Sequence, residues 1–155
     1  METQRIVVGV DGSEGSRRAL RWALEEAAKH GSVVEAVMVW QSPSGFGDTM
    51  GARLDESKIA QAARERLDET IAEVAADDFA VRIEPAVVEG DAALVLCRRA
   101  AEADLLVVGS LGHDPSSSVA LGSVSTRCAQ RSPRPIVIVP RNDEPLRQEG
   151  AGGST

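Results

Sequence analysis

Glycine and serine residues are concentrated between positions 108 and 125 in a pattern that could bind a phosphate group. Gly109 and Gly112 are three residues apart, and nine further residues precede the run Gly122-Ser123-Val124-Ser125. Glycine lets a backbone approach an anion closely and adopt positive φ. The free N–H groups and the dipole of a helix N-terminus attract phosphate, and serine hydroxyls add donors that can also ligate Mg²⁺. The pattern favours an anion site, and the alternative is a solvated linker in which Ser123 is only a helix N-cap.

A second turn, Asp11-Gly12-Ser13, follows an apolar run near the N-terminus. A dinucleotide site would need GxGxxG at this place, whereas the glycines here are Gly9, Gly12 and Gly15. The chain also lacks the GxxxxGK[ST] motif of a P-loop. Two common phosphate loops are therefore excluded as motifs. Asp11 could contact a ligand, or it could be an ordinary Asx residue of the turn.

The residue types that most often carry catalysis form no recognisable constellation in this sequence. His30 follows the end of a predicted helix, whereas His113 lies inside the glycine-rich segment, where it could contact phosphate. Cys97 and Cys128 have no metal-ligand spacing, and we expect small buried side chains in a reducing compartment. We therefore predict a binding site without an assigned catalytic residue, and slow phosphoryl transfer stays open.

Five short apolar runs alternate with helical patterns along the chain. Ser13 and Asp91 suit helix N-caps, and Gly31 suits a helix end. The predicted strands are Arg5–Val10, Val33–Trp40, Val81–Val88, Asp104–Gly109 and Pro135–Pro140.

This alternation is typical of a parallel sheet with helices on both faces. We predict a single doubly wound, Rossmann-like α/β domain whose five parallel strands have the order 3-2-1-4-5. The third strand alternates polar and apolar residues and contains Pro85, which favours a sheet edge. The ligand crevice of such a sheet lies where strands one and four end, so the turn at Asp11 and the segment from Gly109 should meet there.

The spacing of apolar residues also assigns the faces of two helices. Between residues 59 and 74 an apolar stripe should face the sheet, while charged side chains occupy the other positions. In the next helix we expect Leu94, Cys97 and Ala101 to face inward. The glycine-containing loop Gln41–Gly51 is a candidate lid or partner surface.

The composition excludes some classes of partner. A chain of 155 residues with 43% hydrophobic content fits one domain, here residues 1–141, followed by a disordered polar tail at 142–155. A net charge of -7 opposes nucleic-acid backbones, and 3% aromatic content offers few stacking surfaces, so we expect no nucleic acid as partner. No run approaches the ~20 apolar residues that span a bilayer, and residues 1–5 do not suit a signal peptide. We expect no membrane contact and a cytoplasmic location.

The last predicted strand contains the apolar run Ile136-Val-Ile-Val139 and lies at an edge of the predicted sheet. A bare apolar edge promotes aggregation unless it is covered or paired. We therefore predict a C2 homodimer in which this strand pairs antiparallel with its copy. The alternative is that the tail after Arg141 folds over the edge.

Three segments together resemble the universal stress protein family. Gly109-x2-Gly112-x9-Gly122-Ser123 is similar to the ATP-binding signature of that family. Ile6-Val-Val-Gly-Val-Asp-Gly-Ser13 and Ile136-Val-Ile-Val-Pro140 resemble its opening and closing segments. The resemblance covers roughly residues 3–141 in the right order. It implies ATP as the ligand, accompanied by Mg²⁺ or Mn²⁺, and it implies the same homodimer.

The resemblance also implies roles for individual residues. Those that would hold the nucleotide are Val10, Asp11, Val39, Gly109, Gly112, Gly122, Ser123, Val124 and Ser125. The first three would contact the adenosine, the next two the ribose and phosphate, and the last four the phosphates. Two departures from the family pattern, Leu111 in place of a basic residue and Asp114 in a normally glycine-rich run, should weaken binding. The alternative for Asp114 is that it lies near the metal and helps binding.

The implied function is that of a nucleotide-dependent stress-response regulator with an unidentified protein partner. Two alternatives stay open. One is a slow ATPase or phosphotransferase, which would need a positioned base and water. The other is a dimeric interaction protein that binds no nucleotide because its loop has diverged at Leu111 and Asp114.

Overall fold

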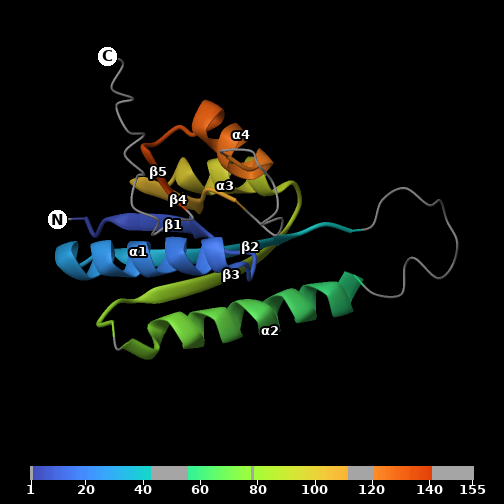
Figure 1. Ribbon diagram of the computed structural model, residues 1–155, viewed down its shortest axis with the longest axis horizontal. Helices are drawn as coiled ribbons and strands as arrows, with labels where there is room; N and C mark the ends of the chain where they lie inside the picture. The colour runs from blue at the N-terminus through green and yellow to red at the C-terminus, as the bar shows by residue number, and fades with distance from the viewer. Residues whose placement is uncertain (1, 43–55, 78, 112–120, 141–155) are drawn as a thin grey trace, which may run out of the picture.

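Strands and helices alternate along the chain in the computed structural model, which describes residues 2–42, 56–77, 79–111 and 121–140 (Figure 1). Within these ranges the strands are β1 (Arg5–Gly9), β2 (Val33–Trp40), β3 (Ile83–Glu89), β4 (Leu105–Gly109) and β5 (Ile136–Val139). The helices are α1 (Glu14–His30), α2 (Glu56–Val74), α3 (Ala92–Ala100) and α4 (Ser123–Arg131), and a 3-10 turn, η2 (Ala75–Asp77), continues α2.

The strands form one parallel sheet in the order β3-β2-β1-β4-β5, which confirms the predicted fold class. Figure 1 shows α1 and α2 on one face of the sheet and α3 and α4 on the other. In the central register Val8 pairs with Ala36 of β2 and with Val107 of β4. Strands β3 and β5 lie at the two edges, as expected from the alternation in β3 and from the predicted order.

Successive side chains of the central strands enter two separate apolar layers, because residues of a strand alternate between its faces. Val8 packs with Leu20 and Leu24 beneath α1, whereas Val7 and Leu106 belong to the layer beneath α3 and α4. All five of these side chains are fully buried. Burial on both faces explains why the central strands are continuous apolar runs in the sequence.

The predicted helix ends are confirmed by their hydrogen bonds and dihedral angles. Ser13 caps α1, its hydroxyl oxygen accepting from the N–H of Ser16 at 3.2 Å. Gly31 ends α1 in the left-handed region at φ 66°. Asp91 caps α3, its carboxylate accepting from the N–H of Leu94 at 3.0 Å.

The predicted inner face of α3 is wrong at Leu94 and Ala101, whereas Cys97 is partly buried and packs on the apolar layer as predicted. Leu94 is 42% exposed and Ala101 is also exposed, whereas Ala93, Leu96 and Ala100 are buried. Hydrophobicity favoured Leu94, but the sheet selects the row at i, i+3 and i+7, where two alanines allow close packing. The predicted tail at 142–155 and most of the loop at 41–51 lie outside the described residues.

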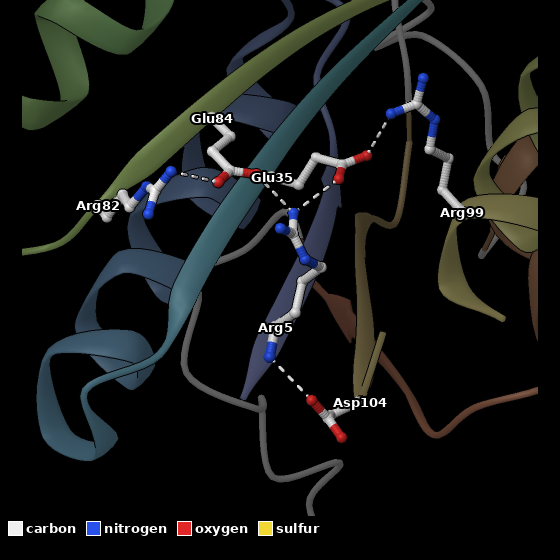
Figure 2. Close-up of polar contacts among 6 residues, drawn as sticks. All are labelled: Arg5, Glu35, Arg82, Glu84, Arg99 and Asp104. Atoms are coloured by element: carbon white, nitrogen blue, oxygen red, sulfur yellow. Dashed lines mark hydrogen bonds and ion pairs between the residues drawn. The ribbon is translucent and has the colours of Figure 1, made fainter. Parts of the chain in front are cut away.

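A network of charged side chains connects three strands with α3 near the amino ends of the strands (Figure 2). The guanidinium of Arg5 binds Glu35 at 2.9 Å and Glu84 at 2.7 Å, and Arg99 of α3 binds the other oxygen of Glu35 at 2.7 Å. The hydrogen bond from Arg5 is the main reason that the pKa of Glu84 lies below its usual value. The network therefore holds the end of the sheet opposite to its ligand crevice.

Candidate functional site

A cavity of about 680 Å³ opens at the carboxyl ends of β1, β2 and β4. Its walls come from these strand ends, from the first turns of α1 and α3, and from α4. This is the place where a doubly wound sheet binds ligands, because the chain leaves β1 and β4 in opposite directions. The volume lies within the range of small-molecule sites.

The structure brings together residues that the sequence analysis took from separate segments. Eight of the nine predicted site residues line the cavity. They are Val10, Asp11, Val39, Gly109, Gly122, Ser123, Val124 and Ser125. The ninth, Gly112, lies outside the described residues, as do His113 and Asp114.

One wall of the cavity is the turn that follows β1. The carboxylate of Asp11 accepts from the N–H of Ser13 at 2.9 Å, so Asp11 forms the Asx turn that the sequence left open. Gly12 has a φ of 82°, a conformation that favours glycine. The hydroxyl of Ser16 accepts from the N–H of Asp11 at 3.2 Å and binds the turn to α1. Asp11 is thus held in place at the cavity wall by its own turn.

Gly109 ends β4 directly against the first turn of α1. A Cβ atom at this position would lie 2.8 Å from the carbonyl oxygen of Gly15, too close for any other residue type without movement of the backbone. Positive φ is not the reason for glycine here or at Gly122, since neither belongs to the positive-φ glycines of the described residues. Close packing of β4 on α1 therefore explains Gly109, in addition to its position in the cavity wall.

The N-terminus of α4 points toward the cavity without a side-chain cap. Gly122 is the N-cap residue, and no side-chain hydrogen bond caps the helix. The hydroxyl of Ser125 is buried and donates toward the carbonyl oxygens of Ser110 and Gly122, each at 3.0 Å. Ser123 is exposed instead. The helix start can offer backbone N–H groups and the Ser123 hydroxyl to an anion, while Ser125 fixes the loop.

The family model of the universal stress protein family matches residues 2–140. The chain belongs to this family. A universal stress protein of Mycolicibacterium smegmatis is 32% identical over 136 residues, which are 86% of this chain and 45% of that protein. One from Mycobacterium tuberculosis is 28% identical over 86% of this chain and 47% of its own length. The chain spans about half the length of the curated relatives it matches.

Solved structures of universal stress proteins share the fold. A protein from Lactobacillus plantarum has a TM-score of 0.75 at 21% identity, covering 90% of this chain and 99% of that one. A universal stress protein in complex with cAMP has a TM-score of 0.57 at 30% identity, covering 90% of this chain and 98% of that one. An Archaeoglobus fulgidus protein in complex with dAMP has a TM-score of 0.54 at 21% identity, covering 90% and 99%.

One residue of this universal stress protein lines the cavity although the sequence analysis did not select it. Arg127 lies on α4, four residues after Ser123 and hence on the same face of the helix. Its guanidinium binds the carboxylate of Asp91 at 2.9 Å, and both side chains are partly exposed. The hydrogen bond from Arg127, followed by that from the N–H of Leu94, lowers the pKa of Asp91. Helical spacing could have identified Arg127, but its contact with Asp91, 36 residues away, needs the fold.

The remaining candidate residues form no metal or catalytic cluster in the part of the chain that the structure describes. No group of three or more His, Cys, Asp or Glu side chains could hold a metal ion there. His30 lies at the end of α1 and contacts Glu26 at 3.1 Å. Cys97 and Cys128 come together between α3 and α4 and are both free thiols. None of the described helices is at once long enough and apolar enough to cross a membrane.

Proposed function

We propose that this universal stress protein binds ATP in the cavity and acts as a nucleotide-dependent regulator of a stress response. The observation that carries this proposal is the convergence of eight predicted ligand residues on one cavity beside an uncapped helix N-terminus. An adenine ring would lie at the apolar end formed by Val10, Val39 and Leu96. The phosphates would lie at the start of α4, where N–H groups and the helix dipole favour negative charge.

A related protein supports the choice of an adenine nucleotide. The universal stress protein in complex with cAMP is 30% identical over 90% of this chain, and a more distant fold relative was solved with dAMP. Acid extraction of the bound nucleotide measures the number of its phosphates.

A divalent ion, Mg²⁺ or Mn²⁺, would accompany the triphosphate. The described lining residues supply one carboxylate, Asp11, and hydroxyls such as that of Ser123, which are oxygen donors of the kind that these ions prefer. This small donor set fits an ion that is held mainly by the phosphates. The ion would neutralise part of the phosphate charge.

Acid extraction of freshly purified protein, followed by chromatography of the released material, tests the proposal. We expect ATP from the native protein and none from Gly122→Glu, since a carboxylate at the helix start repels phosphate. Gln130→Glu is the matched control, because it adds the same charge to an exposed position of the same helix outside the cavity. If native protein releases no nucleotide and added ATP does not shift its melting temperature, the proposal is wrong.

The same extraction separates binding from hydrolysis. Release of ADP alone, or conversion of added ATP during long incubation with Mg²⁺, would favour a slow ATPase. The described part of the cavity offers Asp11 as its one acidic side chain, and that carboxylate already holds the turn at Ser13. We therefore propose retention of ATP, with the bound nucleotide changing the surface that an unidentified protein partner meets.

We also propose that the protein is a homodimer and that it acts in the cytoplasm. Every residue of β5 is only partly buried, and the strand lies at the edge of the sheet, which supports pairing with a second copy. Two adjacent thiols that remain free agree with a reducing compartment.

A further inference from the structure

The ion pair between Asp91 and Arg127 joins the N-terminal ends of two helices at the cavity wall. Asp91 is the N-cap of α3, and Arg127 follows one turn after the start of α4. Their charged atoms are 2.9 Å apart, with 37% of the Asp91 and 42% of the Arg127 side chain exposed. Both charges are therefore within reach of solvent, and the Arg127 side of the pair lines the cavity.

Arg127 has an unusual position among the residues that line this cavity. Of the lining residues that the structure describes, it is the only basic one, and Asp11 is the only acidic one. Every other described lining residue is apolar or carries no charge. Among the described lining residues, a phosphate group that enters the cavity thus finds one cationic side chain, and that side chain is already paired with a carboxylate.

From this arrangement we infer that Arg127 is an anion-contacting residue of the site and that Asp91 sets how strongly the cavity discriminates by phosphate charge. The inference rests on the proposed nucleotide function and goes beyond it by naming the specificity device. While Asp91 is paired with Arg127, the carboxylate offsets much of the attraction that the guanidinium exerts on a phosphate. Removal of the Asp91 carboxylate leaves the positive charge of Arg127 fully available to the ligand.

The two members of the pair should have opposite effects on affinity. Arg127→Gln should lower the affinity for AMP by roughly threefold and the affinity for ATP by about tenfold, since the Coulomb interaction scales with ligand charge. Asp91→Asn should strengthen the binding of AMP and of ATP by similar factors, again with the larger effect on ATP. Asparagine can still cap α3 through its side-chain oxygen, so this variant removes charge while it keeps the helix start. The affinity for adenosine, which carries no phosphate, should change by less than about twofold in either variant.

Calorimetric titration of the full chain with adenosine, AMP and ATP at low salt measures these affinities, first without a divalent ion. Arg131→Gln is the matched control, because it removes the same charge from an exposed position of α4 outside the cavity. Arg127→Lys should restore part of the lost affinity. Thermal unfolding of each ligand-free variant checks that the fold is intact.

Two results would overturn the inference. One is that Arg127→Gln weakens the binding of adenosine as much as that of ATP, and the other is that Asp91→Asn weakens the binding of ATP. Either result would mean that the ion pair only holds α3 against α4. The failure of the nucleotide proposal is distinguishable from both, because inorganic tripolyphosphate needs only the anion site. If the native protein binds no nucleotide, its affinity for tripolyphosphate must still fall in Arg127→Gln and rise in Asp91→Asn. An unchanged affinity for tripolyphosphate in both variants would reject the inference.

Discussion

Cys128 lies on the inner face of α4 and is fully buried in the apolar layer that contains Val7 and Leu106. Burial, and then the neighbouring thiol of Cys97, raises the pKa of Cys128 to about 12. The thiol is therefore protonated near neutral pH and serves as a small apolar core residue. Cys97 is only partly buried, so it is the more accessible of the two thiols.

This shift makes stability depend on alkaline pH. An unfolded cysteine loses its proton near pH 8.5, whereas the folded Cys128 keeps it to about pH 12. Between these values the folded state binds more protons, so the free energy of unfolding should fall as pH rises, by at most about 1.4 kcal/mol per pH unit. Urea unfolding in reducing buffer at about pH 7.5 and about pH 9.5 measures the slope.

Two alanine variants isolate the source of this slope. Cys128→Ala removes the titrating group and should flatten the dependence, although it also lowers stability at every pH. Cys97→Ala should keep part of the dependence, because burial is the largest single cause of the raised pKa of Cys128. An unchanged slope in Cys128→Ala would contradict the assignment.

At the scale of elements, the contact between the end of β4 and the start of α1 should be intolerant of added volume. In Gly109→Ala the new methyl group would meet the carbonyl oxygen of Gly15 at 2.8 Å, and backbone cannot move aside as a side chain can. We expect a loss of about 1–3 kcal/mol in the free energy of unfolding. Denaturant unfolding gives the value.

Gly31 is the control for this variant. It ends α1 with φ 66°, and nothing lies within 4 Å of a Cβ atom built there. Gly31→Asn should cost less than about 1 kcal/mol, because asparagine tolerates the left-handed region. Equal losses at both glycines would argue against close packing as the reason for Gly109.

The charged network at the other end of the sheet gives a second prediction for elements. Glu35 is only 12% exposed and binds both Arg5 and Arg99. Glu35→Gln removes the charge that two guanidinium groups share, and we expect a loss of about 1–3 kcal/mol in unfolding free energy. Glu73→Gln, which removes an exposed partner of Arg17, should cost only about 0–1 kcal/mol. Denaturant midpoints of the two variants compare these effects, and similar midpoints would show that the network adds little.

The sequence predicted the elements well where the signal is local. Ser13, Gly31 and Asp91 mark helix ends because capping depends on residues within one turn. The inner face of α3 was missed because its register depends on the sheet beneath it and not on its own hydrophobic pattern.

The site shows the same division between local and long-range signals. Spacing alone located the glycine-rich segment, and the resemblance to a family supplied the residues that now line the cavity. The contact of Gly109 with Gly15 and that of Asp91 with Arg127 join residues far apart in the chain. Neither contact has a sequence signature, so both required the fold.

At the scale of the whole molecule, the free edge of β5 carries the proposed dimer. Carbonyl oxygens of Pro135 and Val139 accept from the N–H groups of Leu106 in β4 and of Ser110 just after it, each at 3.0 Å. Backbone groups alternate sides along a strand, so the N–H of Ile138 points to the open edge. Ile138→Pro removes that donor and keeps the ladder to β4.

We expect Ile138→Pro to be a monomer and native protein to be a dimer in sedimentation at micromolar concentration. Ile138→Ala is the control, since it shortens the side chain but keeps the N–H and should still dimerise. A monomeric native protein would reject the proposed edge pairing. Dissociation of Ile138→Ala as well would indicate that side-chain packing, and not the backbone ladder, holds the two copies together.

The close contact of Gly109 with Gly15 also determines in which direction ligand occupancy can be transmitted. Backbone atoms pack directly on backbone atoms there, so β4 and α1 cannot move closer together on that side of the cavity. The opposite side consists of α3 and α4, which pack on each other and are bridged at the cavity wall by one partly exposed ion pair. Both α4 and α1 pack on β5, so a displacement of α4 would reach the edge strand. In the proposed dimer, a second copy paired at that edge would then register whether the cavity is filled.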